Sequence, residues 1–116
     1  MAERAKRALA DDVVEALPKV RQLCQKFADC EETTSYGNPT FKRGRKNFLV
    51  LDRYKGRSCL WLLVDPVNRD DQLTVEGWFA SPYDPRETAL CCDLAKLDWS
   101  SVGTLIDASY ALSAGI

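Results

Sequence analysis

The middle of the chain alternates between apolar runs and short polar or basic connections. Within residues 36–64 a turn is followed by three apolar segments that we interpret as strands: 40–43, 46–52 and 59–64. Gly44 and Arg45 form a hairpin-type connection between the first two, and residues 53–57 lead from the second to the third. The second and third segments are apolar at both alternate positions, which is typical of central strands covered on both sides.

The first quarter of the chain favours helix. Residues 3–16 are rich in Ala, Glu, Lys, Arg and Leu, and an apolar stripe at helical spacing continues beyond them: Val13, Leu17, Val20, Cys24 and Phe27. Pro18 interrupts the stripe, because proline inside a helix costs about 3 kcal/mol. We therefore expect one helix to end near Ala16 and another to begin with Pro18 in its first turn, with a single kinked helix as the alternative. Residues 29–35 are polar and are expected to connect this region to the turn Tyr36-Gly-Asn-Pro39.

The second half of the chain predicts a short helix, two strands and a final helix. Asp65 and Pro66 suit the N-cap and first position of a helix within residues 66–76. The remaining elements are expected to be a strand at 78–80, a proline-containing connection at 81–87, a strand at 89–94 and a helix at 99–113 capped by Asp98. Helices at both ends of hairpin-connected strands indicate an α+β fold with a mainly antiparallel sheet, and we expect the helices to pack on one face of it.

Length and composition narrow the class of protein. The 116 residues suit one domain spanning 1–116, and 46% hydrophobic with 28% charged residues is ordinary for a globular protein rather than a disordered or fibrous one. No apolar run is long enough to span a bilayer, and residues 1–12 lack the apolar core of a signal peptide. We therefore expect a cytoplasmic protein without a membrane partner, whose five cysteines stay reduced.

Candidate catalytic and metal-ligating residues are sparse. The chain has no histidine, no Cys-x-x-Cys pair, no phosphate-binding glycine-rich loop and no G-x-S-x-G motif. Cys24, Cys59, Cys91 and Cys92 lie in apolar patterns and are expected to be buried and inert, whereas Cys30 lies in a polar segment and is expected to be the exposed one. These observations favour a protein that is not an enzyme, with no cofactor, no metal and no catalytic residues, and leave a small enzyme as a third possibility.

Positive charge gathers on the two strand connections. Residues 42–57 hold seven basic residues against one acid, Asp52, for a local balance of +6 in a chain of net charge −1: Lys42, Arg43, Arg45, Lys46, Arg53, Lys55 and Arg57. Basic hairpin tips can neutralise phosphates in a sequence-independent, salt-sensitive way. Tyr36, Asn38 and Tyr54 add side chains that could stack or form hydrogen bonds beside the same strands. The alternative is that charged tips only keep the sheet soluble.

Several stretches of the chain carry a family resemblance. They are Val20-Arg-Gln-Leu-Cys24, the block Glu31-Glu-Thr-Thr-Ser-Tyr-Gly-Asn-Pro-Thr-Phe-Lys42, Leu60-Trp-Leu62, Ser81-Pro-Tyr83 and Ser109-Tyr110. From about residue 12 to 114 the chain resembles the MmcQ/YjbR-like family. The resemblance implies a CyaY-like (frataxin-like) fold with a double-wing arrangement and a DNA-binding function, the wings falling on residues 42–46 and 53–57. The acidic remainder of the surface departs from that function, and the mixed charges before residue 16 do not suit frataxin-type iron binding.

The sequence thus supports three hypotheses of function. The first is a DNA-binding protein that grips the phosphate backbone through Tyr36, Asn38 and the seven basic residues. The second is a non-catalytic protein-interaction or regulatory module, whose partner docks on the turn at 36–39 or on the aromatic segment at 78–83. The third is a small enzyme, which needs a pocket with converging polar groups.

Overall fold

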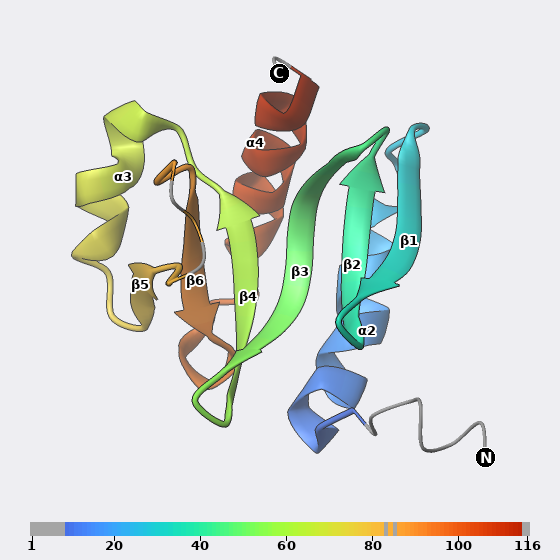
Figure 1. Ribbon diagram of the computed structural model, residues 1–116, viewed down its shortest axis with the longest axis horizontal. Coiled ribbons are helices and arrows are strands. Elements are labelled where there is room, and N and C mark those ends of the chain that lie inside the picture. Colours follow the sequence, from blue (N-terminus) through green and yellow to red (C-terminus); the bar gives the residue numbers. More distant parts are fainter. Residues whose placement is uncertain (1–8, 83, 85, 115–116) are drawn as a thin grey trace.

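The computed structural model describes residues 9–82, 84 and 86–114, and a six-stranded sheet forms its body (Figure 1). The strands lie in the order β1-β2-β3-β4-β6-β5, and every neighbouring pair is antiparallel. Their bounds are β1 Cys30–Ser35, β2 Asn38–Arg43, β3 Lys46–Tyr54, β4 Arg57–Leu63, β5 Trp78–Ala80 and β6 Ala89–Asp93. With the helices at its ends, the sheet confirms the expected α+β class.

Helices α2 (Asp11–Cys24) and α4 (Val102–Ala114) pack together behind the sheet in Figure 1. A third helix, α3 (Pro66–Leu73), lies beside β5, and a short 3-10 turn, η1 (Leu94–Lys96), follows β6. Helix α4 contacts β2, β3 and β4, whereas α2 is tied to the sheet partly by polar side chains. The Arg21 guanidinium of α2 donates hydrogen bonds to both oxygens of the Glu32 carboxylate, and Ser58 of β4 donates one to Asp12. The helices therefore cover one face, as the sequence predicts.

The core lies between this face and the two helices. The expected apolar stripe of α2 is buried, and the strands supply the largest fully buried side chains: Phe48, Leu49, Leu51, Leu60, Leu62 and Leu90. Three aromatic rings close one end of this core. Phe27 stacks on Tyr110 with ring centroids 4.0 Å apart, and Phe48 meets both rings edge-on.

The expected break at Pro18 is wrong, because α2 runs through it as one helix. The alternative of a single helix is the one observed, beginning at Asp11. Pro18 has no amide hydrogen, so the Val14 carbonyl loses the hydrogen bond that it would otherwise accept. Both residues lie on the exposed side of the helix. Water can reach that side, so the loss is smaller than it would be in the core. The buried stripe on the opposite side continues undisturbed, and it stabilises the helix across the proline.

The expectation that residues 29–35 only connect elements is also wrong, because residues 30–35 form the edge strand β1. Four of its residues are exposed, so it carries no apolar alternation. It pairs with β2 through a two-residue turn at Tyr36 and Gly37, whose φ angles of 53° and 83° are those of a hairpin turn that matches strand twist.

Strand β3 contains a β-bulge at Phe48. Phe41 of β2 pairs with Leu49 and the next residue, Lys42, pairs with Asn47, which leaves Phe48 as an additional residue on β3. The β3–β4 ladder also stops at Leu49, one residue short of Phe48. Here the buried Ser109 of α4 bridges the two strands. Its hydroxyl donates to the Phe48 carbonyl and accepts from the Leu63 amide, so α4 satisfies backbone groups that lie just beyond the ladder.

The later elements lie close to their predicted positions. Asp65 accepts a hydrogen bond from the Val67 amide and caps α3 as expected. Asp98 instead begins a turn at 98–101 that leads into α4, which starts at Val102 rather than at residue 99. Hydrogen bonds from the Ser100 hydroxyl and amide lower the pKa of Asp98. In the described part of the chain, no helix has both the length and the apolar character needed to cross a membrane.

Candidate nucleic-acid interface

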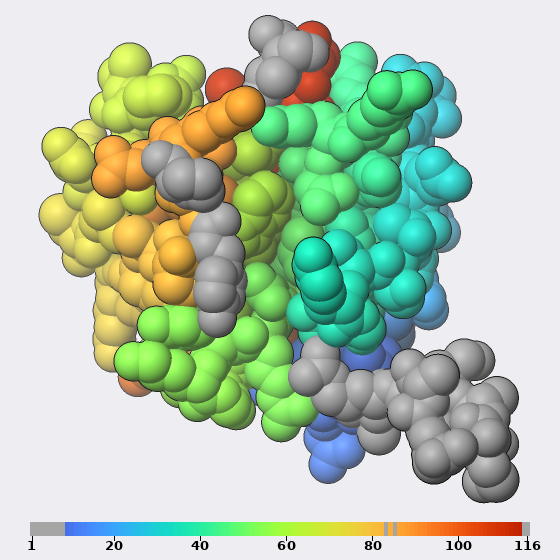
Figure 2. Space-filling view, in the orientation of Figure 1, coloured from blue at the N-terminus to red at the C-terminus, as the bar shows by residue number. Residues whose placement is uncertain are grey.

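The face of the sheet opposite α2 and α4 contains a groove of about 630 Å³. Side chains alternate between the faces of a strand, and the register pairs Thr40 with Val50 and Val50 with Trp61, which places these residues on this open face. Figure 2 views the open face, which is hollowed along β4 between the green atoms of β3 and the orange atoms on the β6 side. The residues that line the groove are Ser35, Tyr36, Asn38, Asn47, Val50, Asp52, Arg53 and Trp61.

Asp52 is held rigidly within this groove. Its Oδ1 accepts hydrogen bonds from the Asn38 amide nitrogen at 3.1 Å and from the Arg53 backbone amide at 2.7 Å. Its Oδ2 accepts none from the residues that the structure describes. Asn38 is therefore half-buried and engaged with Asp52, rather than free to contact a phosphate as the sequence suggests.

The basic residues divide into two groups at opposite ends of β3. Lys42, Arg43, Arg45 and Lys46 surround the β2–β3 turn, and Arg53, Lys55 and Arg57 surround the β3–β4 turn. Figure 1 shows these turns at opposite ends of the sheet. Eight residue steps at about 3.3 Å separate the first and last residues of β3, so the two groups lie roughly 25 Å apart.

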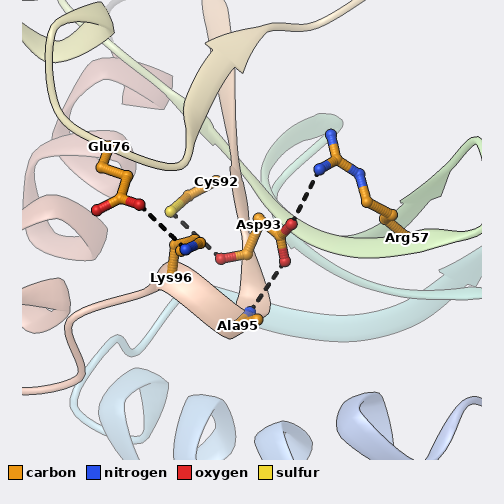
Figure 3. Close-up of polar contacts among 6 residues, drawn as sticks. All are labelled: Arg57, Glu76, Cys92, Asp93, Ala95 and Lys96. Atoms are coloured by element: carbon orange, nitrogen blue, oxygen red, sulfur yellow. Dashed lines mark hydrogen bonds and ion pairs between the residues drawn. The ribbon is translucent and has the colours of Figure 1, made fainter.

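Three of the seven basic residues have partners within the protein: Arg43, Arg57 and Lys55, whose Nζ lies 5.4 Å from the centroid of the Tyr54 ring. The Arg43 guanidinium lies 4.2 Å from the centroid of the Tyr110 ring and donates a hydrogen bond to the Tyr110 carbonyl. This side chain points to the helix face and holds α4 against β2. Arg57 forms an ion pair with Asp93 at 3.2 Å, but 61% of its side chain remains exposed (Figure 3). Asp93 also accepts a hydrogen bond from the Ala95 amide, so it is a fixed partner for Arg57.

Five of the seven basic side chains have no carboxylate within 4.0 Å in the described part of the chain: Lys42, Arg45, Lys46, Arg53 and Lys55. Arg45, Arg53 and Lys55 are exposed, and Lys42 and Lys46 are half-buried. Their positive charge is therefore not compensated locally at either end of β3.

The aromatic residues of the sequence hypotheses have different environments. Tyr36 is 95% exposed at the β1–β2 turn, on the rim of the groove. Tyr54 stacks on Phe79, with centroids 6.1 Å apart, and the Arg57 guanidinium lies 5.8 Å from the Phe79 centroid. Trp78 packs against the core, and Tyr83 lies outside the described residues. The segment at 78–80 is thus engaged with the protein itself, which disfavours it as a docking site.

Sequence reasoning missed five residues of the groove as site residues: Ser35, Asn47, Val50, Asp52 and Trp61. The alternation of β4 contains a signal for Trp61, a large aromatic residue between buried leucines. No comparable signal exists for Asn47, because the bulge at Phe48 changes the face to which the neighbouring residues of β3 point.

Four of the five cysteines are buried as the sequence predicts, whereas Cys30, expected to be exposed, is only partly so. Cys24, Cys59, Cys91 and Cys92 are buried, and Cys30 is half-buried. Burial raises the pKa of Cys24 to about 12 and that of Cys92 to about 11, and a hydrogen bond with Cys91 together with burial raises the pKa of Cys59. These thiols stay protonated near neutral pH, which makes them poor nucleophiles and metal ligands.

Comparison with known proteins adds a fold relationship. No family model and no curated protein matches this chain. It superposes on the crystal structure of DR2400 from Deinococcus radiodurans, described as a DUF419 domain, with a TM-score of 0.71, covering 83% of this chain and 76% of that one. The two share a fold. At 18% sequence identity the likeness extends no further than the fold, so membership of the MmcQ/YjbR-like family stays a prediction.

Proposed function

We propose that this protein binds DNA by gripping the phosphate backbone at both ends of β3, as a cytoplasmic member of the MmcQ/YjbR-like, double-wing class. The observation that carries the proposal is the set of five basic side chains without a carboxylate partner in the described chain. Such side chains can pair with phosphates, which hold condensed cations in the free nucleic acid. Phosphate contacts release counterions from the nucleic acid, which gives affinity without sequence preference.

The spacing of the two basic groups suits a long contact. Roughly 25 Å between them corresponds to about seven base pairs of duplex at ~3.4 Å per step along a strand. A backbone that crosses the open face therefore meets positive charge on both sides of the groove. Arg43 is not part of this contact, because its guanidinium is engaged with Tyr110.

The salt dependence of binding tests this proposal. Five neutralised phosphates predict a slope of log K against log salt concentration of about −4.5 for duplex DNA. Charge reversal at Arg45, Arg53 and Lys55 removes three contacts, so the slope should fall by about 2.7 and affinity should drop at every salt concentration. Fluorescence anisotropy with a labelled duplex measures both.

A matched control lies on the helix side. Lys26 forms an exposed ion pair with Asp107 and is remote from the open face, so Lys26→Glu tests a charge reversal outside the proposed contact. It should leave the slope unchanged. The proposal is contradicted if the protein does not bind DNA at low salt. It is also contradicted if Lys26→Glu weakens binding as much per reversed charge as the changes at Arg45, Arg53 and Lys55.

The exposure of Tyr36 supports a second candidate function, protein interaction at the β1–β2 turn. Tyrosine is enriched among the residues that dominate binding energy at interfaces, and this ring is 95% exposed. This candidate is favoured over the first if the wild-type protein captures a partner and Tyr36→Ala abolishes that capture. The slope of log K against log salt concentration for DNA should then be unchanged by the substitution.

A further inference from the structure

The groove on the open face combines an apolar floor with polar walls. Trp61 and Val50 come from the two central strands, β4 and β3, and the rest of the lining is largely polar. Its volume of about 630 Å³ lies within the range of about 300–1,000 Å³ found for small-molecule sites. A flat ring can therefore enter it and lie against the indole of Trp61.

Several polar groups that line the groove make no hydrogen bond with any residue that the structure describes. They are the Asp52 Oδ2, the side chains of Ser35 and Asn47 and the indole N–H of Trp61. Asp52 is the most strongly oriented of them, because two donors fix its other oxygen. It presents a preorganised acceptor, which loses little conformational entropy when a ligand donates to it.

These groups define the chemistry of the ligand. Trp61 suits a planar ring, Asp52 suits N–H donors, and the basic residues at either end of β3 suit phosphates. One nucleotide unit offers all three features. Guanine suits the site best, because its Watson–Crick edge presents two adjacent N–H donors, N1–H and the N2 amino group, to one carboxylate.

We propose that the groove holds one unpaired guanine of a single-stranded nucleic acid, stacked on Trp61 with its N–H edge on Asp52. This inference rests on the proposed function, and it specifies which nucleic acid is bound. A base in a duplex keeps its edge paired and its faces stacked, so it does not enter a groove of this kind without being flipped out. The groove lies between the two basic groups, so a strand whose base occupies it carries its phosphates toward both.

The experiment compares three labelled ligands by anisotropy at one low salt concentration: a nine-residue thymidine strand, the same strand with a central guanine, and a guanine-containing duplex. The wild-type protein should bind the guanine strand more tightly than the thymidine strand. Loss of the stacking platform in Trp61→Ala should weaken the guanine strand by about 5- to 150-fold. Circular dichroism verifies that this variant is folded.

A gentler pair of variants keeps the test valid if Trp61→Ala does not fold. Asp52→Asn and Glu31→Gln each remove one negative charge from the open face. Glu31 lies on that face because it pairs with Lys42, which the alternation of β2 places there. Both changes should slightly strengthen electrostatic binding. Only Asp52→Asn should abolish the preference for guanine, because Glu31 does not line the groove.

The outcomes separate this inference from the proposed function. A guanine preference that Asp52→Asn abolishes and Glu31→Gln retains supports both. Binding of all three ligands with equal affinity, with no guanine preference in the wild type or in Asp52→Asn, overturns the groove inference and leaves backbone binding in place. Absence of binding to every ligand at low salt overturns both.

Discussion

Replacement of Ser109 by alanine should be among the most destabilising single changes in this protein. Ser109 is fully buried, and its hydroxyl joins the Phe48 carbonyl of β3 to the Leu63 amide of β4. The register of these strands ends at Leu49 and Leu62, so no ladder bond between β3 and β4 replaces the two that are lost. Each buried backbone group left without a partner costs about 1–3 kcal/mol, which predicts a loss of roughly 2–6 kcal/mol.

Urea denaturation followed by circular dichroism measures this loss. With an m-value of about 2 kcal/mol/M, the midpoint of unfolding should fall by about 1–3 M while the slope is retained. Ser113→Ala is the matched control, because Ser113 is also buried in α4 but its hydroxyl bonds only the Tyr110 carbonyl of the same helix. It should cost less than about 1 kcal/mol.

A particular result would refute this reasoning. If Ser109→Ala unfolds within about 0.5 kcal/mol of the wild type with the same m-value, the hydroxyl does not bridge the strands. A loss equal to that of Ser113→Ala leads to the same conclusion, because it leaves only the general cost of removing a serine hydroxyl from the helix.

Three further predictions follow from local structure. Gly77 has a φ of 93°, and a Cβ there would lie 2.5 Å from the Cβ of Lys96, so Gly77→Ala should lower the melting temperature. Gly103 lies inside α4, and a Cβ there would have its nearest contact at 3.5 Å, so Gly103→Ala should raise stability by about 0.4–1 kcal/mol. The pKa of Asp98 is lowered in the folded state, so its contribution to stability is present above its unfolded pKa and is lost as the pH falls through the folded pKa; Asp98→Asn should flatten the acid limb of a stability–pH profile. Cys30 should react with a thiol reagent at pH 8 before Cys24, whose pKa is about 12, and equal rates in stopped-flow labelling would contradict this order.

The apolar pattern predicted most of the fold because strongly apolar or clearly capped segments determine it. The helix after Asp65 begins where it was predicted, and the short strand at 78–80 has its predicted bounds. The strands predicted at 46–52 and 59–64 are also observed, with β3 extended to Tyr54 and β4 beginning at Arg57. The misses share a cause. Strand β1 is a polar edge strand that pairs by backbone hydrogen bonds, and α2 passes through Pro18 because tertiary packing outweighs a local cost.

The candidate site was only partly accessible from the sequence. Basic residues in the two connections are visible as a run of charge, but their division into two groups depends on the length of β3. The engagement of Arg43 with Tyr110 joins residues that are 67 positions apart, which no local pattern contains. The groove requires the cross-strand register of β2, β3 and β4 and the bulge at Phe48, and both are tertiary features.

The order of the strands also has a kinetic consequence. Strands β1 to β4 pair in chain order, so their contacts close short loops and can form early. Strand β6 is different, because it pairs between β4 and β5 in the sheet although α3 and β5 separate it from β4 in the sequence. The packing of α2 on α4 joins the two ends of the described chain and has the largest sequence separation of all. Folding should therefore begin in the β2–β3–β4 meander and finish when the two terminal helices close over it.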